Sequence, residues 1–127
     1  MGKVSKADAP NVITEGPVED RSGEVDGYAI GFTKFSADID GAPLLKGLPG
    51  DMCIAPHWGY VISGSVTFSS PGGNETFVAG DAFYVPAGHT PAVTAGTEFL
   101  LFTPAEEANR VNEVMMQNMM AAAGAQG

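Results

Sequence analysis

The sequence has little cysteine and little positive charge. A single cysteine among 127 residues excludes a disulfide bond within the chain and suggests a reducing compartment. Six basic residues stand against 15 acidic ones, for a formal net charge of −9. A protein this acidic repels phosphate backbones and anionic membrane surfaces, so nucleic acids and such membranes are poor partners.

Long apolar runs are also missing. No stretch approaches the ~20 consecutive apolar residues needed to span a bilayer. The charged first residues are not followed by an apolar segment, so we expect no secretory leader. The sixth residue is Lys6, where an N-myristoylation signal requires serine or threonine. We therefore expect a cytoplasmic protein.

The middle of the chain lacks basic side chains and common catalytic motifs. No lysine or arginine occurs between Lys46 and Arg110, so this stretch has no cation to bind a phosphate or a carboxylate. It also has neither the Gly-x-Ser-x-Gly frame of a hydrolase nucleophile nor a phosphate-binding glycine loop. Unless Lys34 or Lys46 points inward, these absences favour a neutral or weakly polar ligand.

Glycine and proline, by contrast, are abundant, with 17 and 9 residues. Together with 44% apolar residues, they indicate one folded domain with many turns. Turn signals recur every ~8–12 residues, a spacing typical of a sandwich or barrel. The expected strands span residues 25–35, 52–56, 60–68 with an interruption at Gly64, 75–78, 82–85, 91–94 and 97–102.

The two ends differ from this β-rich centre. Residues 1–23 are polar and broken by glycine and proline, and we interpret them as an N-terminal arm with a short strand at residues 12–13. Residues 103–106, Thr-Pro-Ala-Glu, have the pattern of a capping box, which predicts a C-terminal α-helix over residues 104–123. Its methionines would serve either as core contacts or as a subunit interface: Met115, Met116, Met119 and Met120.

A spaced set of glycines and a proline lies in the centre of the chain. Gly80 is followed after five residues by Pro86 and then by Gly88, and Gly64 ends an earlier motif. This frame resembles the two motifs of the cupin superfamily. The resemblance implies a cupin-type β-jelly roll, a double Greek key barrel, over residues 24–103, and it implies a homodimer. Because cupins include enzymes, storage proteins and ligand sensors, the resemblance implies no single activity.

The family's metal-ligand positions are not kept in kind. Counting back from Gly64, the family's glutamate position falls on His57 and its first two histidines fall on Asp51 and Cys53. The last family histidine falls on Pro91, which has no side-chain donor. The resemblance therefore does not carry the family's iron or manganese site over to this chain.

A rearranged metal site is an alternative. Residues 51, 53 and 57 have the same parity along an extended segment, so their side chains would face the same way. The chain has two histidines, His57 and His89, and both fall in the motifs where this fold builds its pocket. With Cys53 they would bind zinc, iron or copper and leave one position open, and Asp51 would be a fourth ligand or would orient a histidine.

Each of these residues also has a purely structural interpretation. Cys53 would be a small buried apolar residue, His57 a hydrogen-bonded group in the cavity wall and His89 a surface residue. The aromatic residues nearby would either pack in the core or line a small-molecule site, which is typically apolar with a few polar groups. The predicted ligand pocket consists of His57, Trp58, Tyr60, Tyr84 and His89.

Three functions follow from these observations. The first, which we favour, is binding of a neutral or weakly polar small molecule in the barrel, with His57 as the main polar anchor. The second is a metal-dependent enzyme of the oxygenase or isomerase type, using Cys53, His57 and His89. The third is a structural or regulatory partner protein that docks through its methionine-rich helix. Whether the protein is an enzyme stays undecided at this level.

Overall fold

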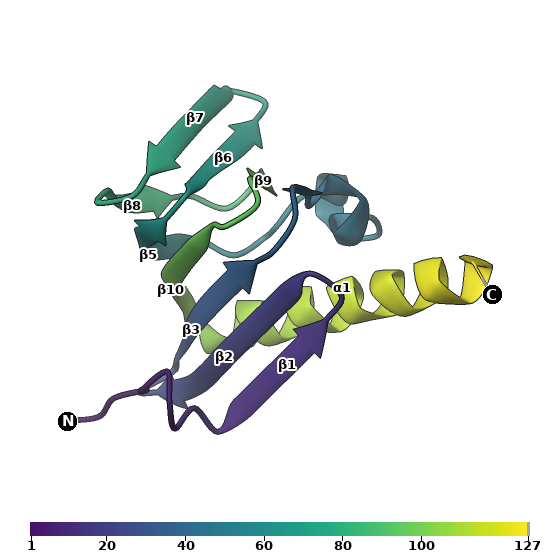
Figure 1. Cartoon of the computed structure of the whole chain (residues 1–127). Coiled ribbons are helices and arrows are strands. Elements are labelled where there is room, and N and C mark those ends of the chain that lie inside the picture. The colour runs from purple at the N-terminus through teal and green to yellow at the C-terminus, as the bar shows by residue number, and fades with distance from the viewer. Residues whose placement is uncertain (127) are drawn as a thin grey trace.

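The computed structural model describes residues 1–126 and contains two antiparallel β-sheets and one long helix (Figure 1). This confirms the prediction of a mainly β fold with a C-terminal helix. The larger sheet has the order β1 (Asn11–Glu15), β2 (Val18–Val25), β3 (Tyr28–Phe35), β10 (Glu98–Pro104), β5 (His57–Ser63) and β8 (Ala82–Val85). The smaller sheet has the order β4 (Ile39–Asp40), β9 (Thr90–Val93), β6 (Ser65–Ser70) and β7 (Gly73–Val78).

The main apolar core lies between the two sheets. Alternate side chains of each strand point inward, and Val61 of β5 and Val66 of β6 are fully buried where the sheets face each other. Burial of one valine or phenylalanine side chain contributes about 1.5–3 kcal/mol. The buried cluster consists of Val61, Val66, Phe68, Phe83, Val85, Val93 and Phe99.

The chain crosses from one sheet to the other at Gly64. β5 ends just before it in the larger sheet, and β6 begins just after it in the smaller sheet. Gly64 has a φ angle of 76°, and a Cβ atom there would lie 2.6 Å from the Cα of Thr97. The position therefore requires glycine, and the interruption predicted within residues 60–68 is confirmed.

The larger sheet begins earlier in the chain than the sequence suggested. Residues 11–15 and 18–25 form β1 and β2, so a hairpin occupies most of the segment interpreted as an arm. Asp26 and Gly27 join β2 to β3 and have φ angles of 50° and 81°, as in a type I′ turn. The single strand predicted over residues 25–35 is therefore wrong at its start, because the Asp-Gly pair reverses the chain.

Residues 1–10 lie against the outer face of the larger sheet. Nζ of Lys6 is 2.8 Å from Oε2 of Glu98 and 5.9 Å from the ring centre of Phe32. A Cβ atom on Gly23 of β2 would approach the side chain of Val4 to 2.9 Å, so the segment passes close to the sheet there. This short segment covers one part of the outer face.

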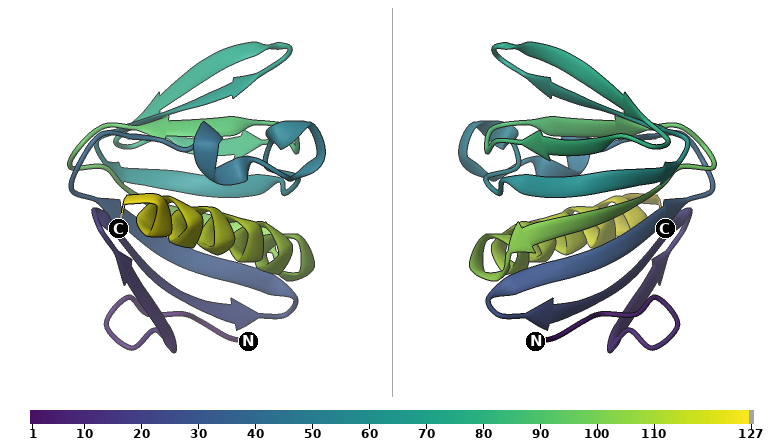
Figure 2. Two further views of the ribbon diagram at one scale, coloured as in Figure 1. Left: turned by 90° about the vertical axis from the view of Figure 1, so that its right-hand side faces the viewer. Right: turned by 90° about the vertical axis from the view of Figure 1, so that its left-hand side faces the viewer.

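The helix α1 (Ala105–Gln126) lies over the inner side of the larger sheet, next to the 3-10 helix η1 (Ala42–Leu45) (Figure 2, left). It begins one residue later than predicted because Pro104 still belongs to β10. The capping box is not formed as expected, since the hydroxyl of Thr103 faces His57. Among the described residues, no helix combines the length and apolar character needed to cross a bilayer.

Two kinds of contact hold α1 in place. Val111 packs in a buried cluster with Leu45 of η1, and Nδ2 of Asn118 donates hydrogen bonds to the carbonyl oxygens of Leu44 (2.7 Å) and Lys46 (2.9 Å). The inner side of the helix carries most of its methionines, which argues against a helix free to dock a partner. Met115, Met116 and Met119 line a cavity between the helix and the sheets, whereas Met120 is 68% exposed.

Candidate functional site

A cavity of about 260 Å³ lies between the larger sheet, the smaller sheet and α1. We call it the barrel cavity. Its walls are mainly apolar, with Phe35, Phe99 and Leu101 on one side and Met115 and its neighbours on the helix. No lysine or arginine lines it. The polar side chains among the lining residues are Asp20, Ser22, Thr33, Cys53, His57, His89, Thr103 and Asn112.

Cys53 is positioned by a short backbone bridge rather than by a strand. The N–H of Cys53 donates to the carbonyl oxygen of His89, and the carbonyl oxygen of Cys53 accepts from the N–H of Gly88, both at 2.8 Å. The strand predicted over residues 52–56 is therefore wrong, because this bridge is its one β pairing. The bridge brings the buried thiol next to a histidine distant in sequence.

His57 is the first residue of β5, and its side chain points into the cavity. Its Nδ1 lies 2.8 Å from Oγ1 of Thr103 on the neighbouring strand β10. Its Nε2 lies 3.6 Å from Sγ of Cys53. The threonine hydroxyl thus holds the ring so that Nε2 faces the thiol.

His89 precedes β9 and is 1% exposed. Its Nδ1 lies 2.7 Å from the carbonyl oxygen of Pro86. Because a carbonyl oxygen only accepts, Nδ1 carries the proton and Nε2 has the free lone pair. That Nε2 is buried and has no hydrogen-bond partner among the described residues, although buried polar atoms are normally paired.

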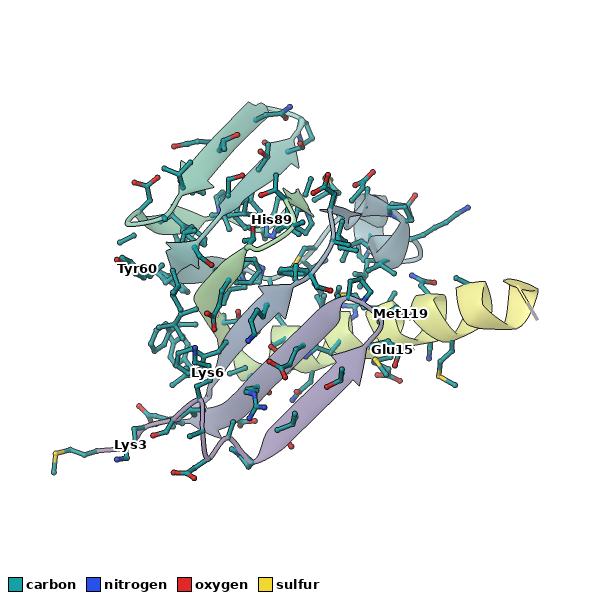
Figure 3. The ribbon with its side chains drawn as sticks, viewed as in Figure 1. Lys3, Lys6, Glu15, Tyr60, His89 and Met119 are labelled. Carbon is teal, nitrogen blue, oxygen red and sulfur yellow. The ribbon has the colours of Figure 1, made fainter. Side chains whose placement is uncertain are left out.

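The structure brings Cys53, His57 and His89 together. The thiol sulfur and one ring nitrogen from each histidine all lie within 4.8 Å of one another, and the two imidazole ring centres are 5.0 Å apart. Figure 3 shows His89 between the sheets. The two histidines of the chain therefore share one interior site.

Asp51 does not join this group. It ends the 3-10 helix η2 (Pro49–Asp51), it is exposed, and its Oδ1 accepts a hydrogen bond from the N–H of Gly47 at 2.9 Å. The parity argument that placed it beside Cys53 and His57 is wrong, because residues 49–57 do not form one extended strand.

The donor groups of the site are uncharged near neutral pH. Burial, and then the charge of the neighbouring His89, lower the pKa of His57 to about 3. Burial also lowers the pKa of His89, and it raises the pKa of the Cys53 thiol. Two neutral imidazoles and a neutral thiol thus face an apolar cavity, which suits an uncharged ligand or a metal ion that displaces the thiol proton.

Three predicted pocket residues point the other way. Because His57 points inward from β5, Trp58 and Tyr60 alternate outward, and Tyr84 pairs with Trp58 on the same outer face. These side chains are 44%, 44% and 52% exposed, and Figure 3 shows Tyr60 on the outer side. Placing Trp58, Tyr60 and Tyr84 in the barrel pocket is therefore wrong.

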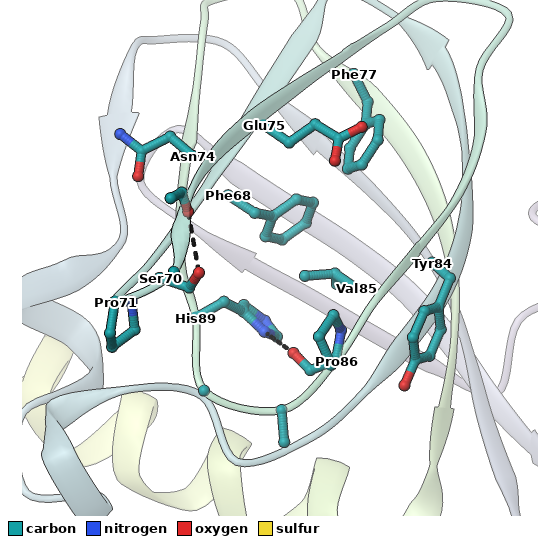
Figure 4. A pocket seen from close by; sticks show the side chains of 14 residues that line it. Phe68, Ser70, Pro71, Asn74, Glu75, Phe77, Tyr84, Val85, Pro86 and His89 are labelled. Atoms are coloured by element: carbon teal, nitrogen blue, oxygen red, sulfur yellow. Dashed lines mark hydrogen bonds between the residues drawn. The ribbon is translucent and has the colours of Figure 1, made fainter.

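Tyr84 instead borders an open cleft of about 500 Å³ between the β6–β7 hairpin and residues 84–89 (Figure 4). Phe68 and His89 line both this cleft and the barrel cavity. The figure shows His89 bonded to Pro86 at the base of the cleft. His89 therefore forms part of the wall between the two spaces.

Asp20, Thr33 and Thr103 line the barrel cavity but were not predicted from the sequence. Asp20 and Thr33 are neighbours on β2 and β3, and Oγ1 of Thr33 donates a 2.8 Å hydrogen bond to Oδ1 of Asp20. The Asp26–Gly27 turn could have revealed β2 and therefore the inward side of Asp20. No comparable signal marks Thr103.

Similar solved structures share this fold. The polyketide cyclase RemF from Streptomyces resistomycificus is 20% identical over 83% of this chain and 80% of its own, with a TM-score of 0.57. KdgF from Halomonas is 18% identical over 82% of this chain and 94% of its own, with a TM-score of 0.56. A cupin-superfamily sugar phosphate isomerase from Silicibacter pomeroyi is 14% identical over 81% of this chain and 75% of its own, with a TM-score of 0.55.

These similarities confirm the resemblance to cupins at the level of the fold. No protein-family model matches the chain, and no curated protein matches it in sequence. At identities of 14–20% the similarity shows the fold alone. The activity has to be argued from the site itself.

The low pKa of His57 predicts acid sensitivity of the metal-free protein. The unfolded chain has a histidine pKa near ~6.5, so it binds one more proton than the folded chain between about pH 6.5 and about pH 3. The free energy of unfolding is unaffected by the protonation of His57 above this window. It falls as pH falls through the window, by up to about 1.4 kcal/mol per pH unit. Urea unfolding measured across that pH range should show the falling free energy of unfolding, and His57→Gln should show a shallower dependence on pH. Equal pH dependence in wild type and His57→Gln would contradict the assignment of the low pKa to His57.

Proposed function

We propose that this cupin-fold protein binds a small, uncharged or weakly polar organic molecule in the barrel cavity, against the imidazoles of His57 and His89. The observation that carries the proposal is the cavity itself, about 260 Å³ with apolar walls and a cluster of neutral polar groups. Such a combination fixes the orientation of a small molecule while the walls supply most of the affinity. Biochemical activity beyond binding is not assigned.

The charge of the lining argues against an anionic ligand. Anionic substrates need arginine or lysine to replace their hydration, and none lines the barrel cavity. The sugar phosphate isomerase among the similar structures acts, by its name, on a phosphorylated substrate. The cavity described here offers no cation for such a phosphate.

A metal-dependent enzyme is the second candidate, and the unpartnered Nε2 of His89 favours it. Sγ of Cys53 and Nε2 of His57 are 3.6 Å apart, close to the ~3.5 Å that the usual zinc bond lengths give for two tetrahedral ligands. Thiolate and imidazole are donors that zinc, iron and copper accept. The donor set therefore fits a divalent transition metal with one position facing the cavity.

The surrounding residues would orient such a site. The hydroxyl of Thr103 holds Nδ1 of His57, and the carbonyl of Pro86 holds Nδ1 of His89, so both Nε2 atoms are left for the metal. A bound metal would supply Lewis acidity or oxygen chemistry to a ligand in the cavity. The thiol of Cys53 has to stay reduced for this role, in keeping with the cytoplasmic location that we propose.

We also propose that the protein is a homodimer. The outer side of the larger sheet carries six large apolar side chains, five of them aromatic, that are 39–52% exposed and that we call the aromatic face: Tyr28, Trp58, Tyr60, Ile62, Tyr84 and Phe102. At roughly 200 Å² per aromatic side chain, this face exposes on the order of 500 Å², at the upper end of what monomers show. A stable dimer buries about 800 Å² per partner, so flanking side chains would supply the remainder.

A second copy of the chain is the occupant that fits this face. Each chain carries a net charge of −9, which opposes association. The six side chains of the aromatic face carry no charge, and a two-fold contact brings this same uncharged surface to both partners. The acidic remainder of each chain stays in solvent.

The cavity proposal predicts binding of uncharged aromatic or aliphatic compounds. A compound at about 100 times its dissociation constant should stabilise the protein by about 2.7 kcal/mol, seen as a rise in melting temperature. His57→Ala should weaken this stabilisation, whereas Tyr60→Ala, on the outer face of the same strand, should preserve it. Equal shifts in wild type and His57→Ala would contradict the proposal.

The metal proposal predicts binding of Co²⁺ or Zn²⁺ by Cys53, His57 and His89. Co²⁺ titration should produce thiolate-to-metal absorption, and Cys53→Ser or His89→Gln should abolish it or weaken binding at least about tenfold. Asp51→Asn serves as the matched control and should bind like wild type. Less than ~0.1 metal per chain by elemental analysis after metal incubation would remove the proposal.

The dimer proposal predicts a two-chain mass in sedimentation equilibrium at micromolar concentrations. Trp58→Glu should shift the protein to monomers, because it places a carboxylate in the centre of an apolar contact. Met120→Glu, on the exposed side of α1, should leave the mass unchanged. A monomeric wild type, or dissociation by Met120→Glu alone, would overturn the assignment of the interface.

A further inference from the structure

Asp20 is a carboxylate that faces the barrel cavity far from the histidines. In the sheet register it lies opposite Ile13 on β1 and Thr33 on β3, and Thr33 lies opposite Phe99 on β10. All four of these residues line the cavity. His57 stands on β5, three strand spacings or about 14 Å across the sheet from β2 and four residues along the strand from Val61, the β5 residue level with Asp20. The cavity thus has two separate polar regions.

The Asp20 carboxylate has no cationic partner. The ion pairs of the described residues join Lys6 to Glu98 and join Arg21 and Lys34 to Glu19, on the other face of β2. Asp20 is the one Asp or Glu among the residues lining the cavity, and Oγ1 of Thr33 satisfies its Oδ1. Burial raises the pKa of this carboxyl more than the hydroxyl hydrogen bonds lower it.

Placing the Asp20 carboxylate in this position costs the ligand-free protein folding free energy. A half-buried carboxylate loses hydration, and the hydroxyls of Thr33 and Ser22 replace only part of it, since burial still raises the pKa of the carboxyl. The apolar neighbours Ile13 and Phe99 offer no further donor. A ligand group that donates a further hydrogen bond to the carboxylate would reduce this deficit.

We propose that Asp20 is a second anchor of the barrel cavity and that it selects a ligand bearing an alcohol or phenol hydroxyl. This inference rests on the proposed binding function and names its ligand class. A hydroxyl has one donor, which one carboxylate oxygen satisfies. An ammonium would bring a strongly hydrated charge between apolar side chains such as Ile13 and Phe99, at a larger desolvation cost than a hydroxyl.

The hydroxyl preference also agrees with the rest of the cavity. The apolar side chains of Phe35, Phe99 and Leu101 would contact the hydrocarbon body of the ligand. With Asp20 accepting at one end, the imidazoles of His57 and His89 contact the remainder or a metal-bound group. The carboxylate therefore contributes to selectivity, because a charge-assisted hydrogen bond is stronger than a neutral one.

The test compares 2-naphthol with 2-methoxynaphthalene, two compounds of similar shape of which the first alone has a hydroxyl donor. By isothermal titration calorimetry, the wild type should bind 2-naphthol about tenfold more tightly than the ether. Asp20→Leu should reduce this preference to about onefold, and Asp20→Asn should reduce it partly. Glu19→Gln, the neighbour on the opposite face, should keep the wild-type preference.

The outcomes separate this inference from the proposed function. Equal affinity for both compounds, or a preference that survives in Asp20→Leu, overturns the role of Asp20 and leaves cavity binding intact. Absence of binding by both compounds, with no hit among other uncharged compounds, overturns both proposals. A 2-naphthylmethylamine that binds more tightly than 2-naphthol overturns the hydroxyl assignment in favour of an amine.

Thermal stability gives an independent readout. Asp20→Asn removes a poorly solvated charge and keeps the side-chain shape, so its ligand-free melting temperature should equal or exceed that of the wild type. A drop of several degrees, together with an unchanged preference for 2-naphthol, would assign Asp20 a structural role and overturn the proposal.

Discussion

The backbone bridge between Cys53 and His89 is the contact on which the candidate site depends. Two hydrogen bonds of 2.8 Å join the segment before β5 to the loop before β9. They place a thiol beside a buried imidazole, and β5 then adds His57 from the next segment. Without this bridge the three donor groups would belong to unconnected parts of the chain, because no regular strand links Cys53 to either sheet.

The chemistry of the site follows from where these groups are buried. Apolar walls make charged forms costly, so both imidazoles are neutral and the thiol keeps its proton. Thr103 and Pro86 each occupy one nitrogen of a ring, which leaves the opposite nitrogen facing the interior. The same arrangement thus supports the two proposals, an uncharged ligand held by neutral groups and a metal bound after the thiol proton leaves.

The alternation of β5 separates two surfaces with different roles. His57 and Val61 point into the interior, whereas Trp58 and Tyr60 point to the outer face. Aromatic residues close to a histidine in sequence therefore end up on the other side of the sheet, where they form the aromatic face. The same rule directs Asp20 into the cavity and the salt-bridged Glu19 away from it.

The sequence by itself determined the features that depend on neighbouring residues: the turn-rich β centre, the break at Gly64, the C-terminal helix and the two motif histidines. Only the tertiary structure decided which distant segments meet. It excluded Asp51, moved Trp58, Tyr60 and Tyr84 outside, and added Asp20 and Thr103. Turn signals and the start of a helix depend on a few adjacent residues. Strand register and the inward direction of a side chain depend instead on pairing between distant segments, such as β2 with β3, which local patterns do not assign.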